Sequence, residues 1–440
     1  MIPNSAVFDQ STLTRLLDQD ALVQRYRRLF ALLDFSALEA HQAARRAPGP
    51  CPHPETASVK AFLVRLCEEK RYMTQLRPFL VEHPLLVLEL GFHLVLDETQ
   101  PYGFDVQRSV PSDRWLRKKL QRLDPTRLQA VFQATVAALQ AEIPGLGEVL
   151  SVDVKHIYAW VRENNPRESI AYRFSKDRQP KGDPDCRVGV KKSTNQEQAD
   201  GTTKEKKEYL WGYGSGVVAA ITANDGDVVL AEYTQPFNET DVTYFRPLYQ
   251  RAVVALNQYP THLAADAAFD AWYVYEGPAR HGGIAAVPLN QHRPGLQRDA
   301  DGTPRCAKGV RMTPVFYYDH PNGYRAQRFR CPLLFPEPVG QSCDHEQFVK
   351  GKGCQKDPNW ELGGLQRVLL DRDGPLYHAV YTQRTSCERI NSQAKELGIE
   401  RPKVRNGPSV SHLNTLTYIV MNVRALQRVQ SINRRLLLRE

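Results

Sequence analysis

The segment "YTQRTSCERINSQAK", residues 381–395, carries four side chains that suit chemistry on a phosphate: Tyr381, Arg384, Glu388 and Lys395. At about 100° per residue, their spacing places all four on one narrow face of a predicted helix. An arginine can fork onto a phosphate and a lysine can act as a point charge beside it. A carboxylate on the same face can bind a divalent cation. The pattern therefore indicates a helix that holds phosphates next to a metal-binding carboxylate.

Two aspartates interrupt apolar runs earlier in the chain, Asp153 in "SVDV" and Asp266 in "LAADA". Buried carboxylates are costly unless something stabilises them, and a divalent cation does so when two lie close together. With Glu388 they would form three carboxylates, enough to hold two Mg²⁺ or Mn²⁺ ions about 4 Å apart. Such a pair of ions can promote in-line displacement at phosphorus.

The order Asp153, Asp266, Glu388, with the spacing Y-x2-R-x3-E-x6-K, resembles the DDE-class transposases of bacterial insertion sequences, in the family named after insertion sequence four. The resemblance covers about residues 146–425. It implies a ribonuclease-H-like core and cut-and-paste DNA transposition, with metals on the three carboxylates. Tyr381, Arg384 and Lys395 would then grip the phosphates of the transposon end.

The same resemblance implies double-stranded DNA as partner, both the terminal inverted repeats and the target, and a homodimer on paired ends. In some relatives an aromatic side chain stacks on a flipped base, for which Trp272 and Trp360 are candidates. Two rival functions stay open: a catalytically inactive transposase-derived DNA-binding protein, and a structure-specific nuclease on the same core.

Some acidic residues have simpler interpretations. "TSCE" fits a capping box with Thr385 as N-cap, which would explain Glu388 without catalysis. Asp270 is a rival for Asp266, although we expect it to cap the helix that follows. Asp225 and Asp227 are expected to be turn residues of a β-hairpin.

The segments that carry these residues alternate between strand-like and helix-like patterns. This alternation predicts an α/β fold with a mixed sheet and flanking helices. Residues 146–295 form the first part of the predicted core, and residues 155–208 within it are expected to be a basic loop. Lys191 and Lys192 in that loop are candidate DNA contacts. Residues 361–440 form the second part, with a β-like stretch at 361–380, the glutamate helix and a C-terminal helix.

Residues 1–145 are expected to be an all-helical N-terminal domain. In "PSDRWLRKKLQRL", Ser112 or Asp113 can cap a helix with one leucine stripe and a basic remainder. The basic face is either a DNA-binding surface or a merely solvated one. Its candidate DNA contacts are Arg114, Arg117, Lys118 and Lys119.

Residues 296–360 are expected to form a Cys-containing insertion. Four of the eight cysteines lie in it, with no C-x2-C pair among them. They are either ligands of a structural Zn²⁺ or ordinary thiols. These residues are Cys306, Cys331, Cys343 and Cys354.

The bulk composition is that of a globular protein, with 440 residues, 42% hydrophobic content and 24% charged residues. The net charge of +9 fits a polyanionic partner without requiring one. The most apolar stretch, residues 78–96, is interrupted by Glu82, His83, Pro84 and Glu89, so we expect a buried helix pair and no membrane span. The start of the chain resembles no secretory signal, which makes the cytoplasm the expected compartment, with association to the nucleoid through DNA.

Overall fold

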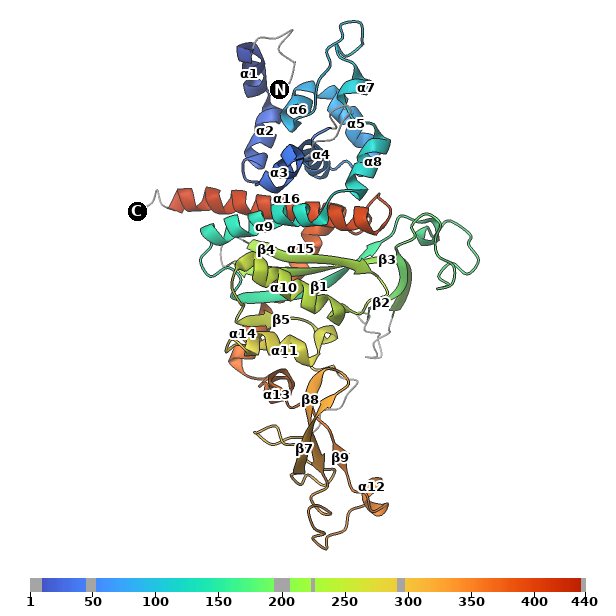
Figure 1. Ribbon diagram of the computed structural model, residues 1–440, viewed down its shortest axis with the longest axis vertical. Coiled ribbons are helices and arrows are strands. Elements are labelled where there is room, and N and C mark those ends of the chain that lie inside the picture. Colours follow the sequence, from blue (N-terminus) through green and yellow to red (C-terminus); the bar gives the residue numbers. More distant parts are fainter. Residues whose placement is uncertain (1–9, 45–52, 194–205, 223–225, 291–296, 437–440) are drawn as a thin grey trace, which may run out of the picture. The chain divides into compact units, whose positions relative to one another are not determined.

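A computed structural model describes residues 10–44, 53–193, 206–222, 226–290 and 297–436 (Figure 1). The protein is an α/β protein with a mixed sheet and flanking helices. The chain forms two compact units. Unit 1 contains residues 1–146, 153–257 and 386–440, and unit 2 contains residues 147–152 and 258–385.

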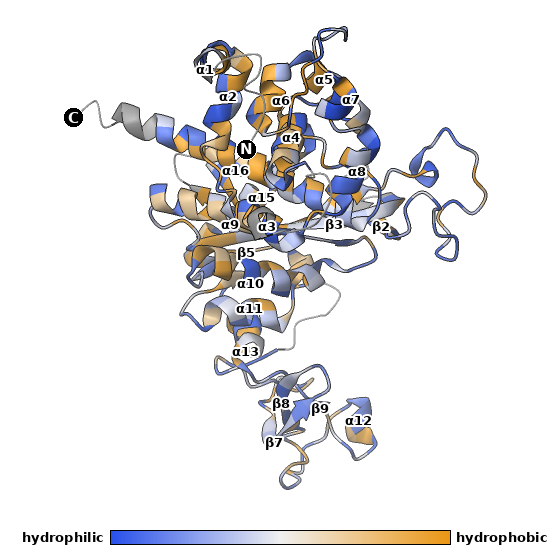
Figure 2. Cartoon of the chain, turned by 45° about the horizontal axis from the view of Figure 1, so that its top comes forward, coloured by the Kyte–Doolittle hydropathy of each residue, from blue (hydrophilic) through white to orange (hydrophobic). Residues whose placement is uncertain are grey.

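The N-terminal part of unit 1 is helical, as its sequence predicts. Its apolar stripes are buried; Figure 2 shows α4 and α6 largely in orange, and these two helices pack together. The chain turns between α5 and α6 at Pro84, which confirms the expected helix pair. No helix in the described ranges is long and apolar enough to cross a membrane. The elements are α1 (Gln10–Gln19), α2 (Ala21–Phe30), α3 (Ser36–Ala44), α4 (Glu55–Cys67), α5 (Met73–Glu82), α6 (Pro84–Leu90), α7 (Val106–Ser109), α8 (Asp113–Gln121) and α9 (Pro125–Glu142).

A six-stranded sheet has the order β2-β3-β1-β5-β6, with β4 paired to β3. In unit 1, β3 (Lys206–Thr222) and β4 (Gly226–Pro236) form the predicted hairpin, and β2 (Arg187–Ser193) pairs antiparallel with β3. The expectation that residues 155–208 form one loop is therefore wrong for β2, and also for residues 155–158 and 206–208, which belong to β1 and β3. The two valines of β2, followed by Lys191 and Lys192, fit a strand on the margin of a sheet. Between β1 and β2 lies one short 3₁₀ turn, η1 (Arg162–Asn164).

Helices cover both faces of this hairpin, and the side chains of β3 alternate between them. Ser215 faces α16 (Gly407–Leu436), where its hydroxyl lies 3.0 Å from the Tyr418 hydroxyl. Gly214 and Gly216 face the opposite layer, α10 (Phe245–Leu256) and the preceding η2 (Asp241–Tyr244). A Cβ on Gly216 would lie 2.7 Å from Tyr244 and 2.8 Å from Leu248. Figure 1 shows α10 and α16 on opposite sides of the hairpin.

The parallel strand pairs of the six-stranded sheet lie in unit 2. The first residues of β1 (Val149–Tyr158) pair with β5 (His262–Ala264), which pairs with β6 (Ala285–Ala286). The predicted helix after Asp270 is α11 (Trp272–Ala279). The β-like expectation for residues 361–380 is wrong, because this stretch forms α13 (Leu362–Leu369) and α14 (Pro375–Thr382).

The Cys-containing insertion in unit 2 has a three-stranded antiparallel sheet of its own. Its strands are β7 (Thr313–His320), β8 (Tyr324–Arg330) and β9 (Gln355–Lys356), and a short helix, α12 (Glu346–Val349), precedes β9. Trp360 packs against its core, with its ring centroid 5.0 Å from that of Phe329. That contact gives Trp360 a structural role in the insertion.

Candidate active site

Asp153 lies in the middle of β1, at the point where the strand changes from buried to half-buried side chains. Leu150 and Val152 before it are buried in the core. The carboxylate is half-buried and accepts a hydrogen bond at Oδ2 from Asn391 Nδ2, 2.8 Å away. Asp153 is therefore a fixed carboxylate beside the helix that carries Asn391.

That helix is α15 (Thr385–Glu396), which the sequence predicted from its amphipathic pattern. Cys387, Ile390 and Ala394 are buried, as expected for its apolar stripe. Glu388 is exposed and lies three residues before Asn391, so the two are neighbours on the helix surface. The face of α15 that presents Glu388 is consequently the face that holds Asp153. Asn391 Oδ1 is buried and has no hydrogen-bond partner among the described residues.

Arg389 anchors α15 to β4. Its Nε and Nη2 donate to the two carboxylate oxygens of Asp227, each at 2.7 Å. The Asp227 side chain is only 3% exposed. Our expectation that Asp227 is only a turn residue is therefore wrong, and Asp225 lies outside the described residues. The signal was present in the sequence, since an aspartate next to "VVLA" is a buried charge that needs a partner.

Asp266, in unit 2, follows β5 by two residues and caps the 3₁₀ turn η3 (Ala267–Phe269). Its Oδ1 accepts from the Ala268 N–H at 2.9 Å. The last paired residues of β1 and β5 are Ser151 and Ala264, and each aspartate comes two residues after them. Ligand sites in parallel sheets characteristically lie at this carboxyl edge.

Asp270 does not cap α11, contrary to expectation; Ala271 holds that position. Instead, Arg367 of α13 donates to both Asp270 oxygens at 2.6 Å, and the Asn290 N–H adds a third bond at 2.9 Å. Burial opposes ionisation of Asp270, but these hydrogen bonds outweigh it and hold its pKa below the usual range. Asp270 is thus occupied by a structural ion pair, which favours Asp266 as the functional carboxylate.

The four motif residues do not share one helix. Tyr381 belongs to α14, which ends at Thr382, and Arg384 precedes α15. The Tyr381 ring stacks on Tyr377 at 5.7 Å, and the Arg384 guanidinium lies 5.9 Å from the Tyr381 centroid. The prediction of one continuous helical face is therefore wrong. Tyr381 and Arg384 fall in unit 2, whereas Glu388 and Lys395 fall in unit 1.

Helix α8 has the predicted cap, since Ser112 Oγ accepts from the Trp115 N–H. Arg114, Arg117 and Lys118 are exposed. Lys119 is less available for a DNA contact than these three residues, because its Nζ lies 2.7 Å from the carboxylate of the buried Glu55. In β2, Lys191 is opposite Glu208 and Lys192 opposite Lys207, and the Lys192 side chain lies outside the described residues.

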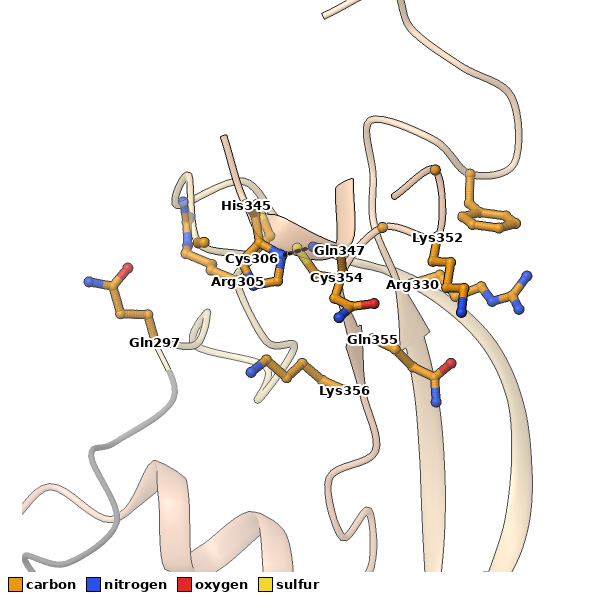
Figure 3. A pocket seen from close by; sticks show the side chains of 14 residues that line it. Gln297, Arg305, Cys306, Arg330, His345, Gln347, Lys352, Cys354, Gln355 and Lys356 are labelled. Carbon is orange, nitrogen blue, oxygen red and sulfur yellow. Dashed lines mark hydrogen bonds between the residues drawn. The ribbon is translucent and has the colours of Figure 1, made fainter. Parts of the chain in front are cut away.

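The insertion gathers its four cysteines into one buried core. Cys306, Cys331, Cys343 and Cys354 pack with Met312, Phe329 and Leu333. Cys306, His345 and Cys354 are among the residues that line a pocket of about 790 Å³, and Figure 3 shows these side chains. Burial raises the pKa of the Cys354 thiol. Within the described residues, no group of three or more His, Cys, Asp or Glu is arranged to hold a metal ion, and this applies to Asp153, Asp266 and Glu388 as well as to the cysteines. Zinc stays a prediction: stoichiometric Zn²⁺ in purified protein would support it, and its absence would overturn it.

No protein-family model, no curated protein and no solved structure matches this chain.

Proposed function

We propose that this protein is a metal-dependent DDE transposase, which cleaves DNA at transposon ends and joins them to target DNA. One observation supports it most directly. A strand aspartate, Asp153, is held by a side chain one helical turn from a helix glutamate, Glu388. A strand carboxylate bound to a helix that carries a second carboxylate is a starting point for phosphoryl transfer with divalent cations. On this proposal Asp266 supplies the third carboxylate.

The donor set is of the kind that Mg²⁺ or Mn²⁺ prefers, since all three proposed ligands are carboxylates. When bound, such ions activate the attacking hydroxyl and stabilise the leaving oxygen. The protein itself fixes the ligands: Asn391 orients Asp153, and the Arg389–Asp227 pair holds α15 to the sheet. Tyr381, Arg384 and Lys395 would bind the DNA backbone, and two copies would act on paired ends.

Glu388→Gln tests the proposal, because an amide binds divalent cations far more weakly than a carboxylate. The substrate is the DNA that flanks this gene in its source genome, incubated with Mg²⁺ or with a chelator. We expect defined cuts at inverted repeats with the wild type and Mg²⁺ only. Glu388→Gln should bind the same DNA with near-normal affinity and make no cuts. The control is Glu82→Gln, the same change at an exposed glutamate of α5.

The two rival functions give different results in this assay. Binding without cuts under any metal would indicate a DNA-binding protein that has lost catalysis. Cuts that depend on DNA structure rather than end sequence, without strand transfer, would indicate a nuclease. Cleavage by Glu388→Gln at the wild-type rate would refute Glu388 as a metal ligand.

A further inference from the structure

Arg65, in α4, is a buried cation for which the described residues provide no acidic partner. Its side chain is 3% exposed, and Nη2 donates to the Arg71 carbonyl oxygen at 2.5 Å. Nε and Nη1 have no hydrogen-bond partner among the described residues. Burial alone lowers its pKa to about 10, with no carboxylate acting in the opposite direction. A buried guanidinium with unused donors is costly unless an anion completes it.

A cavity of about 450 Å³ in unit 1 lies against Arg65. We call it the Arg65 cavity. The end of α15 and the segment that follows form its other wall. Its cationic residues outnumber the three carboxylates, Glu69, Glu396 and Glu400, and Glu400 already pairs with Lys395 at 3.3 Å. The cationic lining residues are Arg65, Lys70, Arg71, Lys395, Arg401 and Lys403.

Aromatic side chains lie beside the same cavity. The Lys403 ammonium is 5.8 Å from the Tyr72 ring centroid and 5.9 Å from that of Trp160. The Arg405 guanidinium lies over the same indole at 4.9 Å. Tyr72 and Trp160 are 40% and 38% exposed, high values for large rings. Cations interleaved with exposed aromatic rings are typical of surfaces that bind a nucleic-acid backbone.

We propose that the Arg65 cavity binds a backbone phosphate of DNA, with the free donors of Arg65 completed by the phosphate oxygens. A guanidinium suits this role because its planar donors match two oxygens of one phosphate. The inference rests on the proposed function, since it assumes that DNA is the ligand. It adds a contact from α4, in the N-terminal helical part, to those expected from the Tyr381–Lys395 motif.

The test is Arg65→Met, which keeps most of the side-chain volume and removes the charge. A purely structural arginine would lose stability on this change. A phosphate-binding arginine should instead leave the unfolding midpoint of the free protein unchanged or raise it, because an uncompensated buried charge is gone. DNA affinity should fall about ten-fold, and the salt slope of log K should decrease in magnitude by about one.

Binding is measured by anisotropy with a labelled duplex in chelator, between about 50 and 200 mM KCl. No cleavage is required, so this test can fail while the Glu388→Gln test succeeds, and the reverse. Lys403→Gln and Arg401→Gln repeat it at less buried positions, in case Arg65→Met does not fold. Arg28→Met, at an exposed position of α2, is the control for loss of charge.

Inorganic phosphate distinguishes the source of the anion. Melting is compared in phosphate and in chloride at equal ionic strength, for the wild type and Arg65→Met. The proposal is supported if Arg65→Met, Lys403→Gln and Arg401→Gln bind the duplex more weakly than the wild type while the control Arg28→Met does not. Unchanged duplex binding by all of them overturns it. Stabilisation by phosphate with unchanged duplex binding also overturns it, and would make the cavity a site for free anions.

Discussion

Asn391 is the side chain that the sequence did not single out and that the structure places against a proposed metal ligand. It lies 238 residues from Asp153 in the chain, so one sequence gives no sign of their contact. The two strand aspartates and Glu388 could be identified because each is a carboxylate in an apolar or amphipathic setting. Asn391 is an uncharged polar residue among other polar residues on its helix face, so its sequence context did not indicate a function.

We expect Asn391→Ala to lower the cleavage rate about 10- to 100-fold, since groups that orient metal ligands typically have effects of this size. DNA affinity should stay unchanged, because Asn391 contacts a ligand and not the backbone. The Mg²⁺ concentration for half-maximal cleavage should rise. Ser392→Ala, one residue further along the same helix, is the matched control. An unchanged Mg²⁺ dependence with only a lower melting temperature would show that Asn391 is structural.

His156 on β1 should make stability depend on pH. Burial, with Lys191 and Lys155 nearby, lowers its pKa to about 4 from 6.5. The folded state therefore resists protonation, and its stability is full above about pH 6.5 and is lost as the pH falls toward 4. The loss should reach at most about 3 kcal/mol. Urea unfolding at several pH values measures it. His156→Gln should flatten that part of the profile, whereas His378→Gln, at an exposed position, should not.

The helices of residues 10–142 could be predicted because apolar residues at helical spacing outweigh everything else there. Two elements, β2 and α13, could not be predicted from the sequence. Strand β2 has only two apolar side chains among its seven residues, and its pairing with β3 is a long-range contact. Helix α13 has the sequence "LGGLQRVL", whose two adjacent glycines disfavour a helix. Its packing against α11 overrides that local preference.

The position of α15 depends on the Arg389–Asp227 ion pair. Arg389→Ala would leave a buried carboxylate unpaired, and the unfolding free energy should fall by roughly 2 kcal/mol, less than for a fully buried pair because Arg389 is half-exposed. Asp227→Asn with Arg389→Gln should recover much of the loss. Arg162→Ala breaks the exposed pair with Glu168, and it should change the unfolding free energy by less than about 1 kcal/mol. Equal effects at both sites would contradict an anchoring role.

The division into two units separates the proposed ligands. Asp153 and Glu388 belong to unit 1 and Asp266 to unit 2, and the chain passes between units just before Asp153 and shortly before Glu388. Sequence alone treats residues 146–295 as one stretch, so this division could not be predicted. The proposed function requires all three carboxylates to bind the ion.

We therefore expect Mn²⁺ to raise the melting temperature of the wild type. When the ion is at 100 times its Kd, it should raise the free energy of unfolding by about 2.7 kcal/mol. Asp266→Asn should abolish most of this rise, although Asp153 and Glu388 are intact. Asp344→Asn, at an exposed position of the insertion, should retain it. Calorimetry with and without Mn²⁺ measures the shift. A full shift in Asp266→Asn would place the ion elsewhere.

The alternating glycines of β3 restrict how this gene can vary. Tyr244 and Leu248 occupy the space that any side chain at Gly216 would need, and Tyr244 does the same at Gly214. Every single-base change of a glycine codon that alters the residue adds at least a Cβ, so each such allele pushes α10 away from the hairpin. Surface loops can diverge freely while "GYGSG" cannot. That short string is consequently a better probe for distant relatives of this protein than the acidic residues, which occur in many unrelated settings.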